Sequence, residues 1–240
     1  MIKKIFVKIL KKLDLKILKI SKNKNSVELL VKLIQKKNIS LVFDIGANTG
    51  QFAKKLRDEN YKKKIISFEP LKKEHEQMKK DSKDDQNWDI YDRCAVGEIN
   101  GEIKLNISNY SPSSSILDFH KNHKKAREDT YMNDTDTVKI FKLDTIVDKL
   151  KLDTENVLIK IDTQGYENKI IIGADRILSN CKILFCEVSL KELYQGQELW
   201  NETIKLLENK GFSICSIENG VFDAHNDELL QADIIFIKNE

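Results

Sequence analysis

Short apolar runs alternate with amphipathic stretches after residue 40, and this alternation most narrows the folds that the chain can adopt. The runs typical of buried strands are Leu41–Ile45, Ile65–Glu69, Trp88–Val96, Val157–Ile161, Ile183–Val188, Phe212–Ile217 and Asp233–Ile237. Helices are expected over residues 51–58, 71–82, 166–178 and 198–210. Buried strands that alternate with helices are typical of a doubly wound α/β fold with a mostly parallel sheet.

The stretch between about residues 98 and 148 interrupts this alternation. It holds a short strand-like run, a serine run, a charged segment and a second apolar run, which read EIKLNIS, SPSSSIL, HKNHKKARED and VKIFKLDTIVDK. An insert before the fourth core strand is a place for a cap that determines specificity. We therefore expect one catalytic domain over residues 39–240 that carries an irregular insert.

The first 38 residues are expected to form a separate unit, a basic amphipathic helical arm. Residues 1–40 hold 12 lysines and two acidic residues, whereas the whole chain has a net charge of only +3. A polar hinge is expected over 21–26 and a second helix over 27–37. Apolar residues recur at helical spacing, namely Ile2, Ile5, Phe6, Ile9, Leu10, Leu13, Ile17 and Ile20.

Lysines interrupt the arm too often for it to span a bilayer, which needs about 20 apolar residues, or to be a cleavable signal peptide. Two interpretations remain open. The arm packs on the body or on a second subunit of a homo-oligomer, or residues 1–20 lie in a membrane interface with their lysines on anionic headgroups. The expected location is the cytoplasm, either free or at the inner face of the membrane.

Composition and short motifs argue against several other classes of protein. The four cysteines show no metal-binding spacing and are expected to be reduced core thiols. The chain beyond residue 40 is net acidic, which disfavours a broad nucleic-acid-binding face. Pro70 and Pro112 are the only prolines, so the sequence lacks both the Pro-Pro motif of base amino-methylation and a Pro-Cys nucleophile pair. We expect no nucleic-acid partner.

A glycine-containing loop, DIGANTG, follows the first predicted strand. Ligands of parallel sheets bind at the carboxyl ends of strands, where Gly46 and Gly50 let the backbone approach closely. The loop matches neither the GxGxxG fingerprint nor the lysine-containing phosphate loop. Glu69 ends the second strand about 20 residues later, where an acidic side chain can bind ribose hydroxyls. A nucleoside without a phosphate chain is therefore expected, and S-adenosylmethionine is one.

Eight short segments then point to a known family. The segments FDIGANTGQF, SFEP, CAVG, SSSIL, LDTI, IKIDTQGYE, EVS and DIIFIK occur in the order seen in the FkbM-type S-adenosylmethionine-dependent methyltransferases. The chain resembles this family over roughly residues 40–238. The resemblance implies a class I methyltransferase fold, a seven-stranded sheet with one antiparallel strand. Many members of the family methylate hydroxyls of sugars or polyketides.

The resemblance also implies a set of cofactor-binding residues. Glu69 would hold the ribose. The adenine would lie beside Ala95 and Val96, which follow the third strand, although plain core packing is the alternative for these two. The methionine end would be lined by Asp44, Gly46, Asn48 and Gly50.

The second motif, IKIDTQGYE, places acidic residues on the neighbouring strands. In this fold Asp162 would face the methyl donor, and Glu187 would end the adjacent strand. The acceptor hydroxyl must lose a proton, which an ordinary carboxylate accepts poorly. Desolvation can raise the pKa of the carboxylate, or a cation can lower the pKa of the hydroxyl. Asp162 and Glu187 are therefore predicted catalytic residues, either as a base and an orienting acid or as ligands of Mg²⁺.

Acceptor-binding residues are expected in the insert and after the fifth strand. Ser114 and Ser115 are candidates for hydrogen bonds to the acceptor or cofactor, with a plain polar turn as the alternative. Tyr194 is a candidate for stacking on a sugar face. His120 and His123 are weaker candidates for the base, and we expect them at the surface.

These observations predict an S-adenosylmethionine-dependent O-methyltransferase. A hydroxyl of a sugar, a nucleotide-sugar or a surface glycan is the favoured acceptor. Two alternatives stay open: an O-methyltransferase of a small secondary metabolite, and a non-catalytic, membrane-associated interaction module. Binding of the cofactor separates the module from both enzymes.

Overall fold

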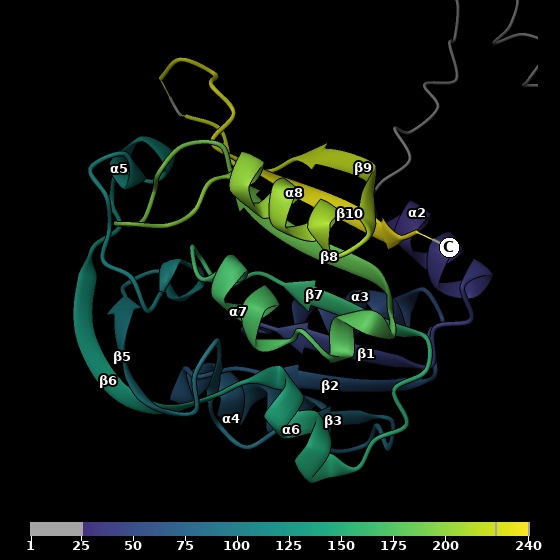
Figure 1. Ribbon diagram of the computed structural model, residues 1–240. Coiled ribbons are helices and arrows are strands. Elements are labelled where there is room, and N and C mark those ends of the chain that lie inside the picture. Colours follow the sequence, from purple (N-terminus) through teal and green to yellow (C-terminus); the bar gives the residue numbers. More distant parts are fainter. Residues whose placement is uncertain (1–25, 224, 240) are drawn as a thin grey trace, which may run out of the picture.

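The computed structural model describes residues 26–223 and 225–239 (Figure 1). Seven strands form one sheet in the order β3-β2-β1-β7-β8-β10-β9. Neighbouring strands are parallel except at β10, which is antiparallel to both β8 and β9. The predicted doubly wound, mostly parallel seven-stranded sheet is thus confirmed. The strands are β1 Leu41–Ile45, β2 Lys64–Phe68, β3 Trp88–Ile90, β7 Val157–Ile161, β8 Cys181–Ser189, β9 Phe212–Asn219 and β10 Gln231–Lys238.

Helices cover both faces of this sheet (Figure 1). Alternate residues of each strand enter opposite cores, so Val42 of β1 joins one cluster and Phe43 the other. Val42 packs with residues of α2 Ser26–Lys36, α3 Gln51–Asp58 and α4 Lys72–Asp81. Phe43 packs with residues of α6 Leu143–Leu150, α7 Glu167–Gly173 and α8 Trp200–Asn209. Both faces are apolar, as the unbroken apolar strands predict.

The insert is more regular than expected. Its long strands β5 Gly101–Ser108 and β6 Met132–Phe141 pair antiparallel, and β4 Ala95–Val96 joins β6 in a separate three-stranded sheet. Between the long strands lie the 3₁₀ turn η1 Ser111–Ser113 and the short helix α5 His123–Ala126. The insert is therefore a small β-sheet that carries a loop, rather than an irregular segment.

The strand predicted over Trp88–Val96 is wrong, because the chain changes sheets within it. β3 ends at Ile90 in the main sheet, whereas β4 pairs with β6 of the insert. Arg93, in the break, donates to Asp136 of β6 at 2.7 Å and to the Pro70 carbonyl at 3.3 Å. These contacts tie the break to the insert and to the segment after β2.

The helix predicted over residues 166–178 is also shorter than expected. α7 ends at Gly173, and a separate 3₁₀ turn, η2 Ile177–Ser179, follows. The Asp144 carboxylate accepts the backbone N–H groups of Arg176 and Ile177 at 2.8 and 2.9 Å. This cap from α6 begins a new turn instead of continuing α7. Residues 1–25 of the predicted arm lie outside the described residues.

The end of β1 approaches the end of β7 so closely that only glycine fits at position 46. Gly46 has φ +71°, and a Cβ atom there would lie 1.9 Å from the carbonyl oxygen of Asp162. Asp162 in turn donates its N–H to the Ile45 carbonyl at 3.2 Å. The two sequence motifs are therefore in backbone contact.

We predict that Gly46→Ala lowers the free energy of unfolding by about 3 kcal/mol or more, because left-handed strain and a backbone clash add. Gly196→Ala is a matched control, since Gly196 has φ +72° and open space around its Cβ position. That control should cost only about 1–2 kcal/mol. Urea denaturation of both variants measures the difference, and equal losses would contradict the close approach.

Candidate active site

The loop after β1 and the end of β2 form one cradle around the Glu69 carboxylate. Glu69 Oε2 accepts the Asn48 N–H at 2.7 Å, and Oε1 accepts the Leu71 N–H at 2.8 Å. Asn48 has φ +48°, which turns its N–H toward the carboxylate. Burial raises the pKa of Glu69 to about 7, although the two backbone hydrogen bonds lower it. An acid that titrates near neutrality therefore lies at the carboxyl end of β2.

A pocket of about 1050 Å³ opens at this edge of the sheet, and its walls come from both motifs and the insert. Gly46, Asn48 and Glu69 line it, together with the buried Ala95 and Val96. The predicted cofactor residues that face the pocket are thus brought together by three separate segments. Their roles toward the cofactor stay predictions.

Two of the predicted cofactor residues do not line this pocket. Gly50 faces the core, because a Cβ atom there would lie 2.5 Å from the Trp88 ring. Asp44 is fully buried behind the pocket wall, where Ser67 donates to its Oδ2 at 3.2 Å. Asp44 is therefore not placed to contact a ligand in the pocket directly.

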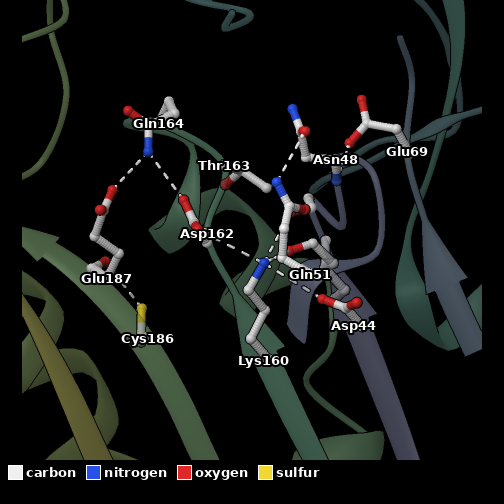
Figure 2. A network of polar contacts seen from close by, with 12 residues as sticks. Asp44, Asn48, Gln51, Glu69, Lys160, Asp162, Thr163, Gln164, Cys186 and Glu187 are labelled. Atoms are coloured by element: carbon white, nitrogen blue, oxygen red, sulfur yellow. Dashed lines mark hydrogen bonds and ion pairs between the residues drawn. The ribbon is translucent and has the colours of Figure 1, made fainter. Parts of the chain in front are cut away.

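The Lys160 ammonium lies between Asp44 and Asp162 at the edge formed by the carboxyl ends of β1 and β7 (Figure 2). It is 3.3 Å from Asp44 Oδ1 and 3.7 Å from Asp162 Oδ2, and it donates to the Gly46 carbonyl at 2.8 Å. Burial lowers the pKa of Lys160, but the Asp44 and Asp162 carboxylates outweigh burial and raise it. Lys160 is therefore a permanent cation that joins β1 to β7.

Asp162 and Glu187 are connected through one side-chain amide (Figure 2). Gln164 Nε2 donates to Asp162 Oδ1 at 2.9 Å and to Glu187 Oε2 at 2.7 Å. Gln231 of β10 donates to the same Glu187 oxygen at 2.7 Å. Burial raises the pKa of Glu187 well above its ordinary value, and the Asp162 and Asp233 carboxylates raise it further. The two predicted catalytic carboxylates therefore lie together.

The serines of the insert contact both motif loops. Asn48 Nδ2 donates to Ser111 Oγ at 3.3 Å, and Ser115 Oγ donates to the Gln164 carbonyl at 2.7 Å. Ser114 lines the pocket, although its Oγ accepts the Ser108 N–H at 3.0 Å. Ser115 also lines the pocket but is buried, so its hydroxyl holds the second loop.

Two aromatic predictions need correction. Tyr194 has no exposed surface, because its ring packs against Phe119 and His123, so it presents no face for a sugar to stack on. His123 is buried rather than at the surface, and its ring stacks on Phe119 at 3.6 Å. Burial lowers the pKa of His123 to about 4. His120 lies near Glu192, with Nδ1 2.9 Å from its carbonyl.

Two central residues, Lys160 and Gln164, were missed in the sequence. A lysine inside the buried run VLIKI is a signal, since a buried cation needs acidic partners. Asp44 pairs with Lys160 in the sheet register, and Asp162 lies two residues beyond it. Gln164 carries no comparable signal, because its role depends on contacts with distant segments.

Residues 26–223 and 225–239 contain no cluster of three or more His, Cys, Asp or Glu side chains arranged to hold a metal ion. In the same part of the chain, no helix is long and apolar enough to cross a membrane. The predicted Mg²⁺ site would therefore have only the two carboxylates Asp162 and Glu187 as protein ligands, and the Gln164 amide already bridges them.

The strand order, the single antiparallel strand and a polar pocket at the carboxyl edge define a doubly wound α/β enzyme of the class I methyltransferase type. The methyltransferase FkbM domain matches residues 44–214. The chain therefore belongs to the FkbM methyltransferase family and is an S-adenosylmethionine-dependent methyltransferase. The predicted family is confirmed.

Individual proteins show more distant similarity. The 2-O-methyltransferase NoeI of Sinorhizobium fredii (strain NBRC 101917 / NGR234) is 25% identical over 174 residues, which cover 70% of each chain. Magnesium protoporphyrin IX methyltransferase (ChlM) from Synechocystis PCC 6803, solved with bound SAM, has a TM-score of 0.48 and 12% identity, covering 89% of this chain and 78% of that one. Precorrin-6y C5,15-methyltransferase from Geobacter metallireducens GS-15 has a TM-score of 0.46 and 12% identity, covering 92% of both.

The residues of the pocket fit an adenosyl group. Glu69 presents a buried carboxylate where ribose hydroxyls can donate to it, and Gly46 lines the pocket with backbone alone. Ala95 and Val96 give the pocket apolar lining, which suits the face of a purine. When bound, S-adenosylmethionine supplies an electrophilic methyl group on a sulfonium.

We predict that Lys160→Met lowers the free energy of unfolding by about 3–5 kcal/mol, because it leaves the Asp44 carboxylate buried without a counter-charge. The double variant with Asp44→Asn should regain part of this loss. Lys139→Met, at an exposed lysine of β6, is the matched control. A loss below about 1 kcal/mol at pH 7 in Lys160→Met would contradict the ion pair.

We predict that affinity for S-adenosylhomocysteine rises with pH through about 7, because the ionised Glu69 accepts the ribose hydroxyls. Below that pH, each unit should weaken binding by up to about tenfold. Glu69→Gln should weaken binding by about 10- to 100-fold at pH 8 and remove the pH dependence. Calorimetric titration from pH 6 to 8 measures both, with the exposed Glu76→Gln as control. A flat wild-type profile would exclude this role for Glu69.

Proposed function

We propose that this enzyme transfers a methyl group from S-adenosylmethionine to a hydroxyl of a sugar or glycan. The observation that carries the proposal is the carboxylate pair Asp162–Glu187 beside the cofactor cradle. Neighbouring carboxylates can accept hydrogen bonds from vicinal hydroxyls, which sugars present. The similarity to a protein named as a 2-O-methyltransferase supports oxygen as the acceptor atom.

Methyl transfer is an in-line displacement, so most of the catalytic effect comes from positioning. S-adenosylmethionine, held by the cradle around Glu69, would supply the methyl group and leave as the neutral thioether, and the acceptor hydroxyl would release its proton to a base of the protein. The Asp162–Glu187 pair accepts that proton. Glu187 is suited to the task because burial raises its pKa, which makes its carboxylate a stronger base. Since the two groups interact, the proton belongs to the pair.

The acceptor half of the pocket is negatively charged. Glu187 of β8 pairs in register with Asp233 of β10, and Asp233 pairs with Glu218 of β9. All three line the pocket. The basic residues of its lining are Lys55, Arg127 and Lys160, of which Lys160 is paired with Asp44 and Asp162. Burial raises the pKa of Asp233 to about 6, and the Asp162 carboxylate adds to the effect. A wall of this charge favours neutral or amino-bearing sugars and repels phosphates, so a nucleotide-sugar is the less suited acceptor.

The test has two steps. Calorimetry with S-adenosylhomocysteine, with and without Mg²⁺ or EDTA, first measures cofactor binding. Transfer of a tritiated methyl group is then measured for methyl glycosides of common hexoses, for glucosamine and for glucose 6-phosphate. We expect micromolar cofactor binding without metal, and transfer to neutral or amino sugars. Preference for the phosphorylated sugar would contradict the acidic wall.

Two other outcomes favour the alternatives. Cofactor binding without transfer to any sugar would favour a small-molecule secondary metabolite as the acceptor. Failure to bind the cofactor would favour the interaction module. Contact of residues 1–20 with a membrane is a separate proposal, which vesicle binding before and after deletion of residues 1–24 would test.

We predict that Asp162→Asn retains affinity for S-adenosylhomocysteine and lowers methyl transfer by about 10²–10⁴. The wild-type rate should rise with pH through an apparent pKa above the usual carboxyl range, and Glu187→Gln should remove that rise. Asp153→Asn is the matched control, because Asp153 is exposed before the amino end of β7. Normal turnover of Asp162→Asn would remove Asp162 from the chemistry.

A further inference from the structure

The Gln164 side chain occupies the space between the two catalytic carboxylates. Its Nε2 carries two hydrogens, and one is donated to Asp162 Oδ1 and the other to Glu187 Oε2, at 2.9 and 2.7 Å. Its Oε1 accepts the Tyr194 hydroxyl at 2.9 Å. Every polar atom of this side chain is therefore engaged, and Figure 2 shows the amide bridging the pair.

The orientation of the amide is determined by its surroundings. The Asp162 and Glu187 oxygens accept hydrogen bonds, so the NH₂ group faces them and Oε1 faces the Tyr194 hydroxyl, which also lies 3.1 Å from the Ser113 carbonyl. Tyr194 is itself held by its packing against Phe119 and His123. The Gln164 backbone has φ +60°, and Ser115 Oγ donates to its carbonyl. A non-glycine residue in this conformation needs such support.

The amide lies where a cation would otherwise be attracted. The Asp162 carboxylate lies close enough to Glu187 and Asp233 to raise the pKa of both. Lys160 approaches Asp162 at Oδ2, whereas the amide contacts Oδ1. Divalent cations such as Mn²⁺ and Mg²⁺ prefer carboxylate oxygens. A bridging NH₂ group provides two positive hydrogens at that position without a net charge.

We propose that Gln164 is a positioning residue whose amide occupies the position between Asp162 and Glu187 where a divalent cation would otherwise bind. The enzyme then orients its carboxylate pair with a protein amide in place of a divalent metal. The proposal rests on the proposed function, because the pair has a catalytic meaning only in a methyltransferase of this kind. A direct consequence is that one added carboxylate at position 164 should convert the bridge into a cation site.

The test is calorimetric titration with MnCl₂ alone, in the absence of any acceptor. Wild type, whose amide fills the position, should bind Mn²⁺ weakly or not at all. Gln164→Leu should do the same, because it keeps only two carboxylates and places an apolar side chain between them. Gln164→Glu should bind one Mn²⁺ at least about tenfold more tightly, since affinity rises with the number of charged ligands. Mg²⁺ should compete for the same site. Gln195→Glu, on the neighbouring exposed loop, controls for added charge.

A second readout separates positioning from a purely structural role. In Gln164→Leu the Glu187 carboxylate, whose pKa burial already raises, loses a hydrogen-bond donor that stabilises its charged form. The fall in Tm relative to wild type should therefore be larger at pH 8 than at pH 5. A structural contact alone would lower Tm equally at both values.

Three outcomes would overturn the proposal. These are tight Mn²⁺ binding by wild type, no gain in Mn²⁺ affinity in a folded Gln164→Glu, and a pH-independent fall in Tm. Affinity for S-adenosylhomocysteine is measured for every variant and should change less than about threefold. If wild type itself did not bind S-adenosylhomocysteine, the proposed function would be wrong. Failure of the proposed function is thereby distinguished from failure of the proposal for Gln164.

Discussion

The Lys160 ammonium connects the two halves of the active-site edge, and the other features depend on that connection. It contacts the Asp44 carboxylate and the Gly46 carbonyl of the first motif and the Asp162 carboxylate of the second. A cation is costly to bury unless its partners surround it, and here they come from two adjacent strands. The same charge explains why a carboxylate as deeply buried as Asp44 can lie behind the pocket. The cradle and the carboxylate pair thus share one electrostatic support.

From this centre the character of the pocket changes along the sheet edge. Toward β2, Glu69 is held by two backbone N–H groups and lies next to small, apolar residues. Toward β8 and β10, Glu187 and Asp233 lie close to one another with raised pKa values. One side is therefore suited to hydroxyls of a bound nucleoside, and the other to proton transfer from an acceptor. The separation follows from the strand order, because Glu69 directly follows β2 whereas Glu187 and Asp233 lie on β8 and β10.

The sequence predicted the sheet and the family, and most of the predicted site residues line the pocket, because these features depend on local patterns. Apolar runs identified the strands, and the spacing of Gly46 and Glu69 identified the ligand edge. It did not predict the exchange of sheets after Ile90, which depends on long-range contacts of Arg93. Nor did it predict the bridge made by Gln164, whose partners lie 2, 23 and 30 residues away. Local rules carry no information on such contacts.

The insert is coupled to the chemistry as well as to specificity. Ser111 contacts the first motif loop, and Ser115 and Tyr194 hold the second, with the Tyr194 hydroxyl also 3.1 Å from the Ser113 carbonyl. An acceptor that displaced the 111–115 segment would therefore shift the Gln164 amide and, through it, both carboxylates. Substitutions at exposed positions of the insert can then change acceptor preference while these contacts stay intact. Changes in the serine run itself alter the geometry of proton transfer together with the shape of the pocket.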